Sequence, residues 1–179
     1  MHTRFPLGFA VFLGCFLNAI QALSFSKTED ALNDSSPQQV LVFLSKDCPC
    51  SRSHIQHLNQ LARDYKKKVS FFGVITDLFD GDQDAEIESY YGDKGFEFPL
   101  IRDDQQTLIK KYKALKTPHV VLLSKTSPES ILFEGGVTDK RDFAKSKTFY
   151  LKSNLEALAQ GHPLPYREEK SLGCYIRRI

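Results

Sequence analysis

The chain has 179 residues, with 24 lysines and arginines against 22 aspartates and glutamates, so its net charge is only +2. Because acids and bases are interspersed, no basic surface for nucleic acid emerges, and we expect no nucleic-acid partner. The length suits one domain with a core large enough to fold alone.

Residues 1–22 have the layout of a secretory signal peptide: a short positive end, an apolar stretch at 5–17 and a small polar exit at 18–22. The apolar stretch is shorter than the ~20 residues of a membrane span. We therefore expect cleavage after Ala22 and a periplasmic or secreted protein. The alternative is a lipoprotein signal at Cys15, and a membrane partner is expected only if Cys15 is lipidated.

Two continuous apolar runs, 40–44 and 69–75, predict strands buried on both faces. Between them, apolar residues at three- and four-residue steps over 51–65 predict an amphipathic helix. In chain order the pattern then predicts an acidic loop at 77–84, a short helix at 84–91, an extended segment at 98–101, a helix at 105–112, a strand at 119–123, a turn at 126–128, a strand at 131–134 and a helix at 149–160.

The order of these elements predicts an α/β fold. Right-handed crossovers make the first strands parallel, and the hairpin of 119–123 with 131–134 adds antiparallel ones. We expect a mixed central sheet flanked by helices on both faces. Around it the mature chain divides into a polar leader at 23–38, the folded domain at 39–161 and a polar tail at 162–179.

Cysteine content points to thiol chemistry. If Cys15 leaves with the signal peptide, Cys48, Cys50 and Cys174 remain. An odd number in an oxidising compartment leaves a thiol free or paired with another molecule, which a purely structural disulfide framework would not need. Cys48 lies between the first strand and the first helix, where a helix N-terminus lowers a thiol pKa. The neighbouring Asp47 opposes ionisation and partly cancels this effect.

A second signal is Lys116-Thr117-Pro118-His119, directly before the strand at 119–123. A cis Thr117–Pro118 bond would bring this loop against Cys48 and expose a backbone edge that can grip a peptide or a thiol partner. Only about 5–6% of X–Pro bonds are cis, so the prediction depends on the cysteine rather than on the dipeptide.

With these features the chain resembles the thioredoxin fold, and more narrowly exported bacterial redoxin-domain proteins of the alkyl hydroperoxide reductase and thiol-specific antioxidant type. The segments that carry the resemblance are 43–48 (FLSKDC), the helix at 53–65, 98–103 (FPLIRD), 112–118 (YKALKTP), 136–139 (GVTD) and 173–176 (GCYI). The resemblance implies that Cys48 attacks and that Thr117-Pro118 is a cis-proline loop. It also implies substrate contacts at Pro49, thiol or disulfide partners of protein or small-molecule type, and no cofactor, while the reductant stays open.

The resolving thiol departs from the thioredoxin pattern, because Ser51 stands three positions after Cys48. Cys50, two positions on, would have to close a very small and strained ring. Cys174 is the other candidate, since a mobile tail can fold back at a closure cost that grows slowly with length. The sequence predicts thiol–disulfide exchange by Cys48, resolved by Cys50 or Cys174.

A thiol-dependent peroxidase is one alternative function. It needs a hydroxyl and an arginine beside the cysteine, and Ser45 with Arg102 or Arg141 are the candidates. We rank it below general thiol–disulfide exchange.

A Cu(I)-binding chaperone is another alternative, using Cys48, Cys50 and His119, because Cu(I) selects thiolates. His54 and His57, on the opening helix, are expected to face solvent instead. A third possibility is a binding module that has lost its redox role.

Overall fold

The computed structural model describes residues 25–26, 33–78, 84–126 and 130–179. The predicted signal peptide with Cys15 lies outside the described residues, as do half of the leader and parts of the predicted loop at 77–84 and turn at 126–128. Within the described part of the chain, no helix is long and apolar enough to cross a membrane.

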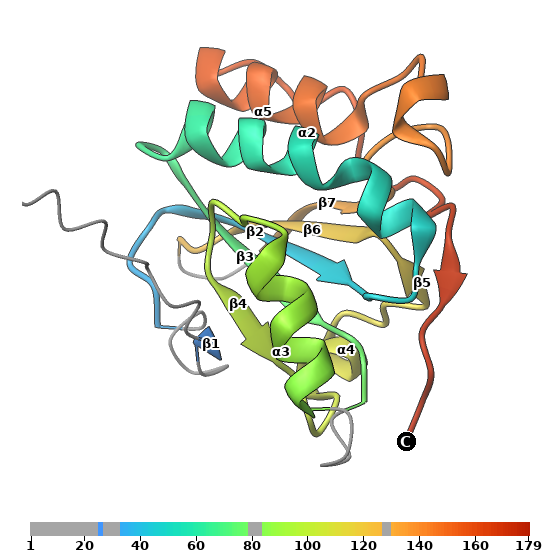
Figure 1. Cartoon of the computed structure of the whole chain (residues 1–179). Helices are drawn as coiled ribbons and strands as arrows, with labels where there is room; N and C mark the ends of the chain where they lie inside the picture. Colours follow the sequence, from blue (N-terminus) through green and yellow to red (C-terminus); the bar gives the residue numbers. More distant parts are fainter. Residues whose placement is uncertain (1–24, 27–32, 79–83, 127–129) are drawn as a thin grey trace, which may run out of the picture.

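A six-stranded mixed sheet forms the centre of the molecule, in the order β1–β4–β3–β2–β6–β7 (Figure 1). The strands are β1 (Phe25–Ser26), β2 (Gln38–Leu44), β3 (Val69–Ile75), β4 (Leu100–Arg102), β6 (His119–Ser124) and β7 (Ser130–Gly135). Strands β1, β4, β3 and β2 are mutually parallel, whereas β6 runs antiparallel to both β2 and β7. The predicted mixed sheet and its closing hairpin are confirmed.

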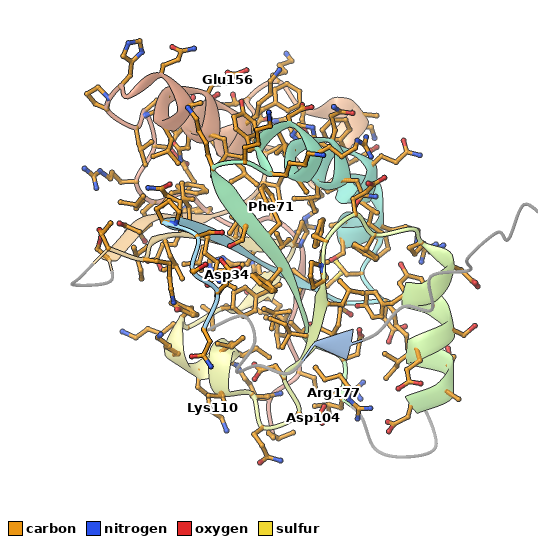
Figure 2. The ribbon with its side chains drawn as sticks, turned by 90° about the vertical axis from the view of Figure 1, so that its left-hand side faces the viewer. Asp34, Phe71, Asp104, Lys110, Glu156 and Arg177 are labelled. Atoms are coloured by element: carbon orange, nitrogen blue, oxygen red, sulfur yellow. The ribbon has the colours of Figure 1, made fainter. Side chains whose placement is uncertain are left out.

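Helices cover both faces of this sheet, as predicted. They are α2 (Pro49–Tyr65), α3 (Asp84–Asp93), α4 (Thr107–Lys111) and α5 (Tyr150–Gln160), with a 3-10 turn at Phe143–Lys145. Side chains of β2 alternate between two cores because successive strand residues point to opposite faces. Val40 and Val42 belong to the core under α2, α3 and α5, and Leu41 and Phe43 to the core that α4 closes. In Figure 2 Phe71 lies in the interior and Glu156 of α5 at the outer surface.

The C-terminal tail is paired with β5 and packed against the domain. Its strand β8 (Cys174–Tyr175) runs antiparallel to β5 (Lys116–Thr117), and the two form a separate small sheet beside the start of α2 (Figure 1). The Ile176 N–H donates to the Leu115 carbonyl at 2.9 Å, and the Ile176 side chain is buried in the α4 core. The tail is therefore part of the fold, which the polar composition of 162–179 does not indicate.

Earlier in the tail, the backbone extends the edge of the main sheet. The Glu134 N–H donates to the Arg167 carbonyl at 3.1 Å, and the Glu169 N–H donates to the Glu134 carbonyl at 3.0 Å. At the far end, the Gln106 side-chain amide donates to the Arg177 carbonyl at 2.7 Å. These anchors on either side of β8 fix the path of the tail along the molecule.

Candidate thiol site

Cys48 is the N-cap of α2, immediately after the loop that follows β2. Its side chain is fully buried, and the Ser51 N–H donates to its Sγ at 3.5 Å. Pro49 occupies the first helical turn, where a missing N–H costs nothing and the fixed φ suits the helix. The sulfur therefore replaces the side-chain oxygen that caps most helices. This is the helix-start position that the sequence predicts for Cys48.

Asp77 holds the loop before the cysteine, a role that sequence reasoning missed. It lies just after β3, and its Oδ1 accepts a hydrogen bond from the Ser45 hydroxyl at 2.8 Å while Oδ2 accepts from the Lys46 N–H at 2.9 Å. The Tyr91 hydroxyl donates to Oδ2 at 2.8 Å. Because β2 and β3 are parallel neighbours, their carboxyl ends meet at one edge, so an acid following β3 reaches the loop that follows β2.

The Thr117–Pro118 peptide bond is cis, as predicted. The Cys48 thiol donates to the Thr117 carbonyl oxygen at 3.1 Å, so this loop lies directly against the cysteine. Thr117 is also the residue opposite Cys174 in the β5–β8 pair. Thr117 thus contacts the Cys48 thiol and pairs with Cys174.

The three cysteines of the described chain converge at this point. All are free thiols, and their sulfur atoms lie within 4.8 Å of one another. Cys48 is buried, whereas Cys50 and Cys174 are half-buried. Two of the sulfurs come from the first turn of α2 and the third from β8, more than 120 residues further along the chain.

Gly173 permits this close approach. A Cβ at position 173 would lie 1.7 Å from the Thr117 carbonyl oxygen, which leaves no room for any side chain. Glycine at position 173 therefore lets the backbone before Cys174 run in contact with Thr117, the residue whose carbonyl also contacts Cys48.

The electrostatics of the three thiols are asymmetric. Burial opposes ionisation of Cys48, but hydrogen bonds from the Thr117 side chain, from Cys174 and from the Ser51 N–H outweigh it and lower the Cys48 pKa to about 7. Burial and the neighbouring Cys48 charge raise the pKa of Cys50. Burial and hydrogen bonding to Cys48 raise the pKa of Cys174 to about 12. Cys48 is therefore the first of the three thiols to ionise, while Cys50 and Cys174 are still protonated.

His54 and His57 do not face solvent, so that expectation was wrong. His54 is buried, and its Nδ1 lies 2.8 Å from the Cys50 carbonyl oxygen while Nε2 lies 2.9 Å from the Thr138 hydroxyl. His57 stacks on Phe143, with ring centroids 4.7 Å apart. A carbonyl only accepts, so the His54 proton lies on Nδ1, and the ring ties the turn that carries Cys50 to the loop after β7.

His119 lies apart from the three sulfurs. Its Nδ1 is 2.7 Å from the Ser171 hydroxyl, its ring packs against Phe43 with centroids 5.7 Å apart, and burial lowers its pKa to about 4. It lines a cavity of about 430 Å³ between β7 and the tail, to which neither Cys48 nor Cys50 contributes. Cys174, and not His119, is the third residue that the fold brings to Cys48 and Cys50.

Of the side chains predicted for a peroxidase, Ser45 and Arg102 are engaged elsewhere, whereas Arg141 lies near Cys50. The Ser45 hydroxyl donates to Asp77, and Arg102 forms ion pairs with Asp84, Glu88 and Asp104. Arg141 is close enough to Cys50 for its charge to favour that thiolate. No observation therefore favours the peroxidase alternative over thiol exchange.

A small polar cavity of about 140 Å³ opens beside Cys174. The loops after β2 and β3 and strand β8 surround it, and its lining includes Asp47, Asp77 and Arg177. Of the three cysteines, Cys174 lines it and Cys48 and Cys50 do not.

A mixed sheet with helices on both faces, a cysteine capping the first helix and a cis-proline opposite it define a thioredoxin-like redoxin. The sequence matches the AhpC/TSA family over residues 22–138, and the chain belongs to that family. No curated protein sequence shows significant similarity to it.

Solved structures support the same fold. An uncharacterized conserved protein from Geobacillus kaustophilus is similar at 26% identity and a TM-score of 0.70, over 85% of this chain and 82% of that one. A hypothetical protein, SMc02350, from Sinorhizobium meliloti 1021 is similar at 22% identity and a TM-score of 0.67, over 80% of this chain and 81% of that one. Both alignments extend well beyond the family match.

Proposed function

We propose that the protein is an exported thiol–disulfide oxidoreductase in which Cys48 is the nucleophile and Cys174 the resolving thiol. The observation that carries the proposal is the pairing of Cys174 opposite Thr117, whose carbonyl contacts the Cys48 thiol. Membership of the AhpC/TSA family supports thiol-based redox chemistry in general. Removal of the signal peptide near Ala22 belongs to the same proposal.

The reaction consists of two successive thiol–disulfide exchanges. The Cys48 thiolate attacks one sulfur of a substrate disulfide, forms a mixed disulfide and releases the other substrate sulfur as a thiolate. Cys174 then gives its proton to that leaving group and attacks Cys48 Sγ, which forms the Cys48–Cys174 disulfide and releases the second substrate thiol. The substrate gains two electrons from the protein thiols. One proton comes from Cys174, and the second substrate sulfur leaves as a thiolate that takes its proton from solvent, where Cys48 lost its own on ionising. The reverse sequence oxidises a substrate dithiol.

The pKa asymmetry suits these roles. A thiol with a pKa near the ambient pH is the best attacking group, because it is ionised yet still nucleophilic. Cys48, with a pKa of about 7, meets this condition. Cys174 is raised chiefly by burial and by Cys48 itself, so its pKa falls once Cys48 is bound in a mixed disulfide and carries no charge.

Cys50 is a poorer resolving group for geometric reasons. It lies two residues from Cys48 at the start of the same helix, so a bridge between them closes a small ring inside a hydrogen-bonded turn. The Cys50 carbonyl is also fixed by His54. Cys174 approaches from a separate strand and can bridge to Cys48 without unwinding α2.

The test is a bridge map combined with three single variants. The reduced protein is mixed with a small aromatic disulfide, quenched with an alkylating agent and digested without reduction. We expect a Cys48–Cys174 peptide pair, a trapped mixed disulfide on Cys48 in Cys174→Ser, no reaction in Cys48→Ser and near-normal turnover in Cys50→Ser. A Cys48–Cys50 bridge in the wild-type protein, or full turnover in Cys174→Ser, would overturn the assignment of Cys174.

A further inference from the structure

The same three sulfur atoms have the arrangement of a soft-metal site. They lie within 4.8 Å of one another and are shielded, since Cys48 is fully buried and the others are half-buried. Metal–thiolate bonds of about 2.3 Å place the sulfurs of a trigonal site about 4 Å apart. Small rotations of the Cys50 and Cys174 side chains therefore suffice to close the triangle around one ion.

The donor set selects the metal. Thiolates favour Cu(I) and zinc over harder ions. Structural zinc sites are almost always four-coordinate, and among the described residues no fourth His, Cys, Asp or Glu joins this group. Cu(I) is satisfied by three thiolates. We infer that the reduced protein binds one Cu(I) ion through Cys48, Cys50 and Cys174.

The surroundings compensate the charge of such a centre. Three thiolates around one monovalent ion carry two net negative charges. Cys48 caps the positive end of the 17-residue helix α2 and accepts the Ser51 N–H, and the Arg141 charge acts on Cys50. Binding releases the protons of Cys50 and Cys174, so copper affinity rises with pH.

This ligand set differs from the one that the sequence suggests. His119 is bound to Ser171 and lines a different cavity, so it takes no part. The tail supplies the third ligand instead, through the pairing of Cys174 with Thr117. A sulfur in a disulfide is no longer a thiolate, so copper binding and the Cys48–Cys174 bridge exclude each other.

The experiment titrates the fully reduced protein with Cu(I) under anaerobic conditions against a chromophoric Cu(I) chelator. X-ray absorption of the copper-loaded protein then counts the sulfur ligands. We expect one retained ion with three sulfur ligands. Cys174→Ser should leave two sulfurs and weaken retention at least tenfold, while His119→Ala, the matched control, should behave like the wild-type protein. Circular dichroism of each variant confirms that it is folded.

The inference would be overturned by complete loss of copper to the chelator, by a two-sulfur site in the wild-type protein, or by equal losses in His119→Ala and Cys174→Ser. Preferential retention of Zn(II) over Cu(I) would do so as well. Copper retention and disulfide exchange are separate readouts, although they share these thiols. A protein that forms the Cys48–Cys174 bridge but holds no Cu(I) refutes only the metal site, and the converse refutes only the proposed function.

Discussion

Replacing Gly173 by alanine tests whether the β5–β8 contact positions Cys174. The added Cβ would lie 1.7 Å from the Thr117 carbonyl oxygen, whereas ordinary contact begins at 3.4 Å. The obstacle is backbone on a strand that the main fold holds, so β8 has to move by roughly the difference between these distances. Such a shift exceeds what a hydrogen bond tolerates.

The structure bounds the cost of this substitution. If β8 leaves β5, the hydrogen bond from Ile176 to Leu115 and the burial of the Ile176 side chain are lost. These contribute about 0.5–1.5 kcal/mol and about 1.5–3 kcal/mol respectively. We therefore expect Gly173→Ala to lower the free energy of unfolding by about 2–4 kcal/mol while the main sheet stays folded. The pairing of Glu134 with the earlier tail survives.

The assay follows formation of the Cys48–Cys174 bridge by quenching with an alkylating agent at increasing times. Since Cys174 moves away from Cys48, we expect bridging to slow at least tenfold and alkylation of Cys48 to become faster. Gly92→Ala is the matched control, because nothing lies within 4 Å of a Cβ there and its helix α3 gains about 0.5–1 kcal/mol from alanine. Wild-type bridging and stability in Gly173→Ala would refute the reasoning.

Three further predictions concern the thiols and the buried histidines. The alkylation rate of Cys48 should rise about tenfold per pH unit up to pH 7 and then level off, because its pKa is about 7; a midpoint near the ordinary value of 9.0 would contradict this. Burial lowers the His57 pKa from 6.5 to about 4, so the unfolded chain binds more protons between these values and stability falls as pH drops through them. Urea unfolding at pH 7 and pH 5 should show a smaller loss in His57→Phe, by at most about 1.4 kcal/mol per pH unit, and an unchanged loss would argue against it. Ser51→Cys should restore turnover to Cys174→Ser, since the residue-51 N–H already lies 3.5 Å from Cys48 Sγ; persistence of the mixed disulfide would refute it.

The elements with strong periodicity could be predicted from the sequence. The apolar runs at 40–44 and 69–75 became β2 and β3, and the three- and four-residue spacing over 51–65 became most of α2. Cys48 at the helix start and the cis Thr117–Pro118 bond followed from the order of these elements. For the strands and the helix the signal is local, because a buried face leaves its period in the sequence.

The contacts that complete the site produce no hydrophobic periodicity in the sequence. Strands β5 and β8 have two residues each, too few for any alternation, and β1 lies within the segment interpreted as a polar leader. Asp77 and His54 look like surface residues in the sequence because their partners are backbone groups, which any sequence carries, and hydroxyls distant along the chain. Gly173, directly before Cys174, is a sequence signal that could have indicated close contact between this segment and another backbone.

The tail also limits which substrates reach Cys48. The backbone edge that the sequence assigns to a partner peptide is filled by β8, with Cys174 opposite Thr117. An extended protein segment can pair there only after β8 leaves, and leaving forfeits the burial of Ile176. The 140 Å³ cavity reaches Cys174, but Cys48 is fully buried and is not among its lining residues. We therefore expect that β8 has to shift before a disulfide reaches Cys48, and that an extended protein segment needs the larger displacement because it has to replace β8 along β5.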